Sequence, residues 1–279
     1  MDKDKYKDKH KDNGMRTGLW LGVAGVAFLA CAAWAPPDEQ DAEIERLRAE
    51  VASLRAELDA RAGYDEADLA AEASVKPGIN DSWKSPNIGP LIGRLETESR
   101  EIWVHRADLA AVVGAPPGAV VADVGAGSGF MTNIFARQVG PEGAVYAVDI
   151  NPTLMEFVAD GAKAEGLENI ETVVCTDKSA ELPPASVDIV FICDTYHHFE
   201  YPKNTMTSIR RALRPGGQVI VVDFHRIEGK TRPFIMEHVR ADEATFTQEI
   251  LDAGFELANR HDVSFLEENY MLRFRRAGE

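Results

Sequence analysis

Two adjacent histidines lie in the segment that carries the most side chains able to do chemistry. His197 and His198 follow Asp194 and Tyr196, and the segment ends at Pro202. An imidazole titrates near neutral pH, so a histidine can act as a general base for a hydroxyl, amine or thiol within hydrogen-bonding reach. We therefore predict His197, His198 and Tyr196 as catalytic residues. The alternative for each histidine is a loop residue that hydrogen-bonds to backbone.

The same two histidines could instead belong to a metal site. Such a site needs further ligands from the chain, and no other residue is placed convincingly in the sequence to supply them. The three cysteines, Cys31, Cys175 and Cys193, show no zinc-binding spacing. We therefore predict no metal site, and we expect Cys175 and Cys193 to be buried strand thiols.

A glycine-rich turn supplies the second candidate site. Gly125, Gly127 and Gly129 alternate with small residues, directly after a valine-rich strand pattern at residues 119–124. Glycine lets the backbone turn sharply and lets its N–H groups approach a ligand at the start of a helix. A dinucleotide-binding turn needs glycine at its first, third and sixth positions, and the sixth position here is Phe130. The spacing therefore favours an adenosyl ligand without a pyrophosphate.

Two carboxylates accompany this turn. Asp123 lies in the strand pattern before the glycines, and Asp149 closes a second strand pattern at residues 144–149. A carboxylate at the end of the second strand can accept hydrogen bonds from both hydroxyls of a ribose. Either feature alone is weak, because many glycine turns are only structural. Together and in this order they predict an adenosyl-binding site formed by Asp123, Gly125, Ala126, Gly127, Gly129 and Asp149.

These motifs resemble those of class I S-adenosylmethionine (SAM)-dependent methyltransferases, in particular the ubiquinone/menaquinone-biosynthesis type. Residues 121–149 are similar to the first motif of that class and to the acidic strand that follows it. Further segments look like the fourth strand, the Pro-Gly-Gly turn with the fifth strand, and a closing antiparallel pair: 188–194, 213–223, 254–257 and 270–274. The resemblance covers about residues 100–275. It implies a doubly wound, Rossmann-like α/β fold with a seven-stranded sheet, SAM as cofactor, and methyl transfer as activity.

The resemblance also implies roles for single residues. Asp123 and the glycine turn would surround the methionine part of SAM, Asp149 would hold the ribose, and Ile150 would lie against the adenine. Asp194, at the end of the fourth strand, would join the cofactor site. Asp177 would meet the adenine amino group. Because its segment departs from the Gly-Asp-Ala-like turn of the family, a solvated turn aspartate is the alternative.

Fold-level similarity suggests further residues around the reaction centre. The ring of Tyr196 could face the cationic sulfonium. His238 and Arg240 fall in an expected lid helix, where acceptor contacts and simple surface exposure are both open. The start of the domain would cap the cofactor with Trp83, Arg94, Glu98 and Arg100.

The acceptor is predicted to be a small molecule or a lipid-like compound. A net charge of −16 repels polyanions at long range. Methyltransferases that act on base amino groups carry an Asn/Asp-Pro-Pro-aromatic motif after the fourth strand, and residues 194–202 lack it. We therefore expect no nucleic-acid partner. The alternative function is a membrane-tethered coiled-coil scaffold with a catalytically inactive methyltransferase fold.

An apolar segment precedes the domain. Residues 1–16 alternate lysine and aspartate and are expected to be a disordered leader. Residues 17–35 predict a transmembrane anchor or a signal segment, which is either cleaved or lipidated at Cys31. The flanking charges favour a domain outside the cytoplasm, whereas SAM is made in the cytoplasm. We therefore predict membrane association and leave the side of the membrane open.

A short coiled coil is predicted at residues 38–62. Apolar residues recur there at heptad spacing: Ile44, Leu47, Val51, Leu54 and Leu58. β-branched residues at one core position and leucine at the other favour a parallel homodimer, here through residues 43–58. A single amphipathic helix packed on its own domain is the alternative. Residues 63–79 would then be a linker, and residues 80–279 the methyltransferase domain.

Overall fold

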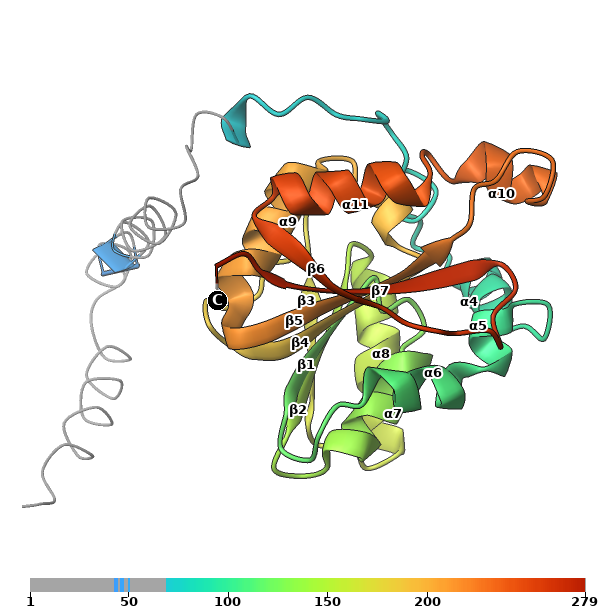
Figure 1. The fold of residues 1–279 in the computed structure, drawn as a ribbon. Coiled ribbons are helices and arrows are strands. Elements are labelled where there is room, and N and C mark those ends of the chain that lie inside the picture. The colour runs from blue at the N-terminus through green and yellow to red at the C-terminus, as the bar shows by residue number, and fades with distance from the viewer. Residues whose placement is uncertain (1–42, 45, 48–49, 51–68, 279) are drawn as a thin grey trace, which may run out of the picture. The chain divides into compact units, whose positions relative to one another are not determined.

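The computed structural model describes residues 43, 44, 46, 47, 50 and 69–278. Residues 69–278 contain a seven-stranded sheet in the order β3-β2-β1-β4-β5-β7-β6, with helices on both faces (Figure 1). This confirms the predicted doubly wound α/β fold. The strands are β1 (Val120–Val124), β2 (Ala144–Asp149), β3 (Ile170–Val174), β4 (Val187–Cys193), β5 (Leu213–Phe224), β6 (Phe255–Arg260) and β7 (Asn269–Arg276). The helices are α4 (Gly89–Leu95), α5 (Glu101–Val104), α6 (Arg106–Val113), α7 (Phe130–Val139), α8 (Pro152–Ala164), α9 (Pro202–Ala212), α10 (Pro233–His238), α11 (Glu243–Asp252) and the 3-10 turn η1 (Tyr196–His198).

The order of the strands reverses between β1 and β4. β1 pairs in parallel with β2 on one side and with β4 on the other. β7 lies antiparallel between β5 and β6, as the closing pair. In open sheets of this kind, a crevice forms at the carboxyl ends of the strands where the order reverses. The fold therefore brings the loop after β1, which begins at Gly125, next to the loop after β4, which begins at Asp194.

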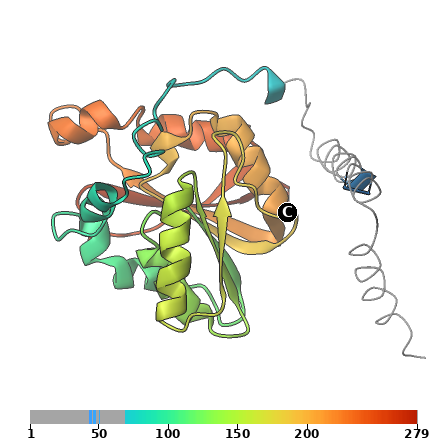
Figure 2. The same cartoon turned by 180° about the vertical axis from the view of Figure 1, so that it is seen from behind.

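Each face of the sheet packs against its own helices. The neighbouring β1 residues Val121 and Ala122 are both fully buried and point to opposite faces, as side chains of a strand must. Val121 shares a core cluster with Phe135 of α7, and Ala122 shares one with Met206 of α9. Helix α8 covers β2 and β3 (Figure 2). Burial on both faces explains why apolar residues stand at consecutive positions of β1 rather than alternating, with Asp123 as its charged member.

Two helix starts fix the loops at this edge. Gly129 precedes α7 with a φ of +80°, a conformation that glycine adopts at little cost. Asn151 caps α8, because its side chain accepts hydrogen bonds from the backbone N–H groups of Thr153 and Leu154. The Asn151 amide also donates to the carbonyl oxygens of Trp83 (2.6 Å) and Ser85 (2.8 Å). One side chain thus joins the start of α8 to a distant part of the chain.

The segment at residues 69–88, which we call the strap, lies across the carboxyl edge of the sheet (Figure 1). Glu72 accepts hydrogen bonds from the backbone N–H groups of Lys203 and Asn204 at the first turn of α9, both at 2.8 Å. Further along, Asn80 donates to the carbonyl oxygen of His198 at 3.2 Å. The strap is therefore attached at both α9 and η1.

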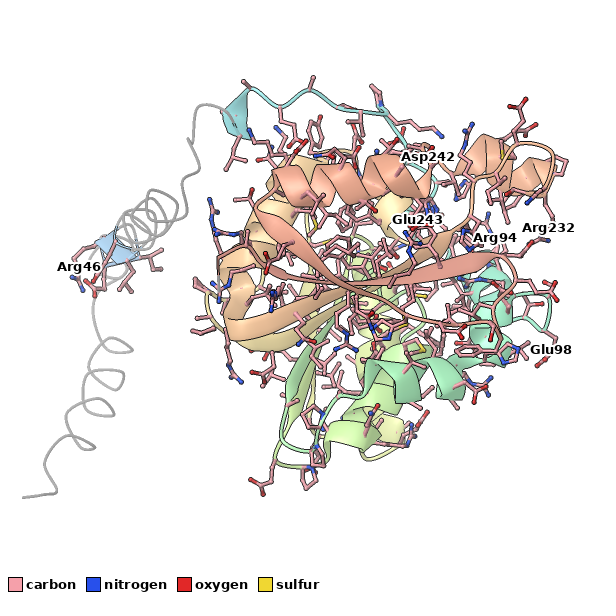
Figure 3. All side chains as sticks on the ribbon, in the orientation of Figure 1. Arg46, Arg94, Glu98, Arg232, Asp242 and Glu243 are labelled. Carbon is pink, nitrogen blue, oxygen red and sulfur yellow. The ribbon has the colours of Figure 1, made fainter. Side chains whose placement is uncertain are left out.

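The described residues before position 58 belong to a separate compact unit. They are helical and exposed, and Arg46 forms an ion pair with Glu43 at 2.6 Å (Figure 3). No helix within the described residues is both long enough and apolar enough to cross a membrane. The predictions for the leader at 1–16 and the apolar segment at 17–35, and most of those for the coiled coil, concern residues outside the described ranges.

Candidate functional site

A cavity opens at the carboxyl edge of the sheet, where the loops after β1, β2, β3 and β4 meet; we call it the cofactor cavity. Its lining includes nearly all of the residues predicted to bind a cofactor: Asp123, Gly125, Ala126, Gly127, Asp149, Ile150, Asp177 and Asp194. Gly129 is not part of the lining, and its role is to start α7. The structure thus brings together residues that are spread over some seventy positions of the sequence.

The glycines allow the backbone to lie close to the opposite wall of the cavity. A Cβ atom on Gly125 would lie 2.2 Å from Oγ1 of Thr195, and one on Gly127 would lie 2.8 Å from Cδ1 of Leu95. Both glycines also have positive φ values. A side chain is therefore excluded at these two positions, because the backbone lies against Thr195 and Leu95.

Asp149 is held in place by backbone donors. Its two carboxylate oxygens accept from the N–H groups of Gly127 at 3.0 Å and Asn151 at 2.9 Å. Each carboxylate oxygen has more than one lone pair, so both can still accept from a ligand. The side chain is thus fixed at the end of β2, at the wall of the cofactor cavity.

The cofactor cavity concentrates buried acidic groups. Burial raises the pKa of Asp123 to about 7, although Thr132 donates to its carboxylate at 2.6 Å. Burial also raises the pKa values of Asp149 and Asp194. Carboxylates that are hard to ionise because they are buried gain from a cation beside them. The site therefore suits a ligand that carries positive charge.

Asp194 connects the cofactor cavity to a second one. It has a φ of +48°, which is uncommon for a residue other than glycine and is found often at functional sites. Its carboxylate accepts from Arg100 at 2.6 Å and from Asn269 at 2.6 Å. These two bonds hold the loop after β4 in this conformation. Sequence reasoning placed Arg100 near the cofactor only by analogy and did not find Asn269.

The strap borders the cofactor cavity next to Asp177. Asp177 accepts from Asn80 at 3.0 Å and from Lys84 at 2.8 Å, and its side chain is only partly exposed. Asp177 is therefore a paired residue rather than a freely solvated one. The neighbouring Cys175 also lines the cavity, and burial raises the pKa of its thiol to about 12.

A second cavity of about 550 Å³ adjoins the first; we call it the acceptor cavity. The two cavities share Trp83, Leu95, Arg100, Asp194 and His198 in their linings. Arg94 and Arg232 lie on its α4 and α10 sides (Figure 3). Four apolar side chains also line it, together with the polar Glu101, Glu268 and Asn269: Ile102, Phe224, Phe234 and Ile235.

Three histidine rings form one wall of the acceptor cavity. The ring centre of His197 lies 4.4 Å from that of His198, and the ring centre of His238 lies 4.9 Å from each of them. His197 is 1% exposed, and its Nδ1 lies 2.8 Å from Oδ1 of the fully buried Asp223. Burial lowers the pKa of His198 to about 2 and that of His238 to about 4, so both rings are neutral at pH 7.

Two predicted residues occupy the core instead of a cavity wall. Tyr196 is fully buried and packs against Phe199 and Phe246. Arg240 forms an ion pair with Glu249 at 2.6 Å, and its guanidinium lies over the ring of Phe246. Neither Tyr196 nor Arg240 lines either cavity, because both point into the layer between the sheet and α11. The structure therefore gives them a packing role.

The residues proposed as a cap also separate into two groups. Trp83 and Arg94 pack together, with the guanidinium 5.7 Å from the ring centre, and both line the acceptor cavity. Glu98 instead accepts from Trp103 at 3.3 Å and points away from the cavities (Figure 3).

Comparisons with known proteins agree with this geometry. Residues 122–221 match the family described as a methyltransferase domain. The ubiquinone/menaquinone biosynthesis C-methyltransferase of Hydrogenovibrio crunogenus is 27% identical over 175 residues, which cover 62% of this chain and 66% of that protein. The enzyme of the same name from Cupriavidus necator is 25% identical over 195 residues, covering 66% and 79%. Residues 122–221 are thus similar to the methyltransferase domain, and the wider chain is similar to SAM-dependent methyltransferases.

A solved structure shows the same fold. The crystal structure of a SAM-dependent methyltransferase from Aquifex aeolicus superimposes with a TM-score of 0.60 at 24% identity, covering 68% of this chain and 97% of that one. SAM is the cofactor of this class, and the site fits it. The glycine turn leaves no room for Cβ atoms at Gly125 and Gly127, the Asp149 carboxylate lines the cavity with both oxygens held by backbone N–H groups, and the buried carboxyl groups suit a cation.

Proposed function

We propose that this methyltransferase moves a methyl group from SAM to a small, largely apolar acceptor bound in the acceptor cavity. One observation carries the proposal: the acceptor cavity adjoins the cofactor cavity, and Asp194, Arg100 and His198 belong to both walls. When bound, SAM supplies an electrophilic methyl group. Much of the rate then depends on holding the acceptor in line with that group, about 3 Å away.

Different residues of the chain bind the cofactor, shield the acceptor from solvent and line the acceptor cavity. Asp149 and the glycine turn hold the cofactor, and Trp83 separates the acceptor from solvent on the strap side. His198 and His238 line the acceptor cavity as neutral rings, and with pKa values lowered by burial to about 2 and about 4 they are poor proton acceptors at pH 7. The apolar lining by Phe224 and Ile235 favours an acceptor with a ring or an alkyl chain.

The relatives support a finer proposal for the acceptor. Both compared relatives are named as C-methyltransferases of ubiquinone/menaquinone biosynthesis. The chain spans slightly less than two thirds of the first of them. We therefore propose a ring compound related to a quinone precursor, with a lipid headgroup as the second choice. An apolar acceptor would also agree with the proposed membrane association through residues 17–35.

A binding experiment tests the cofactor site. Calorimetric titration of the full chain with SAM should show micromolar binding, and NADH should not bind. Asp149→Ala should weaken SAM binding by ~1–3 kcal/mol, the range for losing hydrogen bonds to a charged group. Asp160→Ala on the exposed side of α8 is the matched control and should bind as the wild type does. A folded chain that does not bind SAM would contradict the proposal and favour a scaffold.

An acceptor screen tests the proposed class of acceptor. The chain is incubated with methyl-labelled SAM and with quinone precursors, membrane lipids or water-soluble metabolites in parallel. We expect label in an apolar ring compound. Label confined to water-soluble acceptors would contradict the proposed acceptor class while leaving the cofactor site intact.

The coiled coil supports a separate proposal for assembly. Ile44 and Leu47 lie on an exposed helical segment, with exposed fractions of 45% and 46%. We propose that this apolar stripe pairs with that of a second chain as a parallel homodimer. Sedimentation of residues 36–279 at tens of micromolar should give a dimer, and Leu47→Glu should give a monomer. A wild-type chain that sediments as a strict monomer would contradict it.

A further inference from the structure

Three imidazole rings from two distant parts of the chain meet at the wall of the acceptor cavity. His197 and His198 come from η1, and His238 comes from the last turn of α10. One ring nitrogen from each lies within 4.8 Å of the others. Sequence reasoning found only the adjacent pair and no third ligand. His238 is far from the other two histidines in the sequence and lies next to them only in the folded chain.

One ring nitrogen of His197 and one of His198 have no hydrogen-bond partner among the described residues. These are Nε2 of His197 and Nδ1 of His198, and both atoms are buried. A buried polar atom without a partner costs about 1–3 kcal/mol, so native proteins rarely keep two in one place without a use. Their lone pairs are available for a cation.

The other ring nitrogen of His197 is held by the protein. Nδ1 of His197 lies 2.8 Å from the Asp223 carboxylate, and Asp223 also accepts from the His197 backbone N–H at 3.1 Å. In metal sites, a histidine ligand donates its other N–H to a carboxylate or carbonyl in this way, which fixes the ring and its tautomer. His197 thus has the outer support that a metal ligand needs.

One positive charge of the chain lies close to the three rings. Lys76 donates to the carbonyl oxygen of His238 at 3.1 Å. Its charge weakens binding of a dication at this place, so we expect moderate rather than very tight affinity.

We propose that His197, His198 and His238 bind a first-row transition-metal ion such as Zn²⁺. Nitrogen ligands lie ~2.1 Å from Zn²⁺, which puts them roughly 3.4 Å apart in a tetrahedral site. The observed separations of up to 4.8 Å therefore require each ring to move inward by less than about 1 Å. His238 can make this movement, because it is only half buried and ends α10.

The site has the ligand count of a catalytic metal centre. Three protein ligands leave a fourth position for water or substrate, whereas structural zinc sites use four protein ligands. All three histidines line the acceptor cavity, so the fourth position opens toward the acceptor. This second step rests on the proposed function. It defines the acceptor as a compound with a hydroxyl or carbonyl oxygen next to the atom that is methylated, since that oxygen would bind the ion.

Metal binding by the full chain tests the site without any activity assay. The protein is stripped with a chelator and titrated with Co²⁺, whose visible absorption reports nitrogen coordination, and then with Zn²⁺ in competition. We expect one Co²⁺ per chain that Zn²⁺ displaces. His238→Ala should weaken binding at least 100-fold, and Asp223→Asn by about 10–100-fold, the range for losing the outer partner of a ligand.

The matched control is His225→Ala. His225 follows β5, as His238 does further along, but it packs against Tyr270 and is outside the cluster. It should bind Co²⁺ as the wild type does, which separates the proposed site from binding by other histidines. Absence of stoichiometric Co²⁺ binding, or a His238→Ala variant that binds like the wild type, would overturn the proposal.

Titration of the same proteins with SAM distinguishes a failure of the metal-site proposal from a failure of the proposed function. His238→Ala should retain SAM binding, because His238 does not line the cofactor cavity. A folded variant that loses Co²⁺ but keeps SAM supports the metal site. If the wild type binds Co²⁺ but no acceptor is methylated, the proposed function fails and the metal site stands.

Discussion

At the scale of single residues, burial decides what each polar group of the site can do. Asp123 and Asp149 have the same side chain and line the same cavity. Asp149 accepts two backbone N–H groups at the end of β2, whereas Asp123 has the Thr132 hydroxyl and stays partly protonated near pH 7. Asp149 is therefore suited to orient a ligand, and Asp123 to respond to its charge.

Asp123→Asn should change the pH dependence of stability. Asp123 keeps its proton to higher pH in the folded chain, so its contribution is complete below pH ~4 and is lost as the pH rises through about 7. Asparagine has no such loss. The stability of the variant relative to the wild type should rise across this window by up to roughly 4 kcal/mol. Denaturant unfolding at several pH values without SAM measures it, and a difference that does not vary with pH would contradict it.

Gly125→Ala should destabilise the domain. The new Cβ would meet Thr195 at 2.2 Å in a backbone conformation with φ of +79°, so we expect a loss of ~2–4 kcal/mol. Gly161→Ala is the matched control: it lies inside α8, has no atom within 4 Å of the new Cβ, and should gain about 0.5–1 kcal/mol. Thermal unfolding compares the two. Equal effects of both substitutions would show that the close approach at Gly125 is unimportant.

At the scale of elements, two helix caps allow the effect of a lost cap on the stability of the domain to be distinguished from its effect on SAM binding. Asn151 caps α8 and also holds the strap through Trp83 and Ser85, whereas Asp242 caps α11 by accepting from Thr245 at 2.9 Å (Figure 3). The two caps are similar locally. Only Asn151 also binds the strap, at the edge of the cofactor cavity.

Asn151→Ala and Asp242→Ala should therefore differ in one respect. Each should lose about 1 kcal/mol of stability with its cap, and Asn151→Ala somewhat more because two carbonyls lose their donor. Only Asn151→Ala should weaken SAM binding, because it frees the strap. Unfolding and calorimetry on both variants check this. A loss of SAM affinity in Asp242→Ala of the same size would mean that general destabilisation is the cause.

The sequence predicted local features well and distant contacts poorly. β1, β2 and the glycine turn lie within one stretch of chain, so their pattern was visible. The same stretch carries Asp123 and Asp149. Strand β3 has a weaker pattern because it is only partly buried. Tyr196 was expected at the reaction centre because it adjoins His197, but the turn of η1 directs neighbouring side chains to opposite sides.

Contacts between distant segments were beyond reach of a single sequence. Asp223 ends a buried strand and could have been noticed as a charged residue in an apolar run, which is costly without a partner. Nothing local connects it to His197. Asn269 and Glu72 likewise gain their roles only when β7 and the strap reach the loops after β4.

At the scale of the whole molecule, the strap and the sheet form the two sides of the cofactor cavity. Asn80 and Lys84 of the strap donate hydrogen bonds to Asp177 after β3. Asn151 at the start of α8 donates to the backbone carbonyl of Trp83 in the strap. A bound cofactor should stabilise both contacts. Hydrogen exchange in residues 76–88 should therefore slow when SAM is added, more than in β6 at the far edge of the sheet. Equal protection of both regions would contradict a specific closure.

The attachment of the strap also has a consequence for timing. Residues 80–85 are held at the rim of the cofactor cavity by the bonds to Asp177 and Asn151. Opening of these bonds would widen the entrance, and association steps that wait for an opening are slower than free encounter. The rate at which spent cofactor is exchanged for fresh cofactor would then depend on a segment that takes no part in the methyl transfer itself.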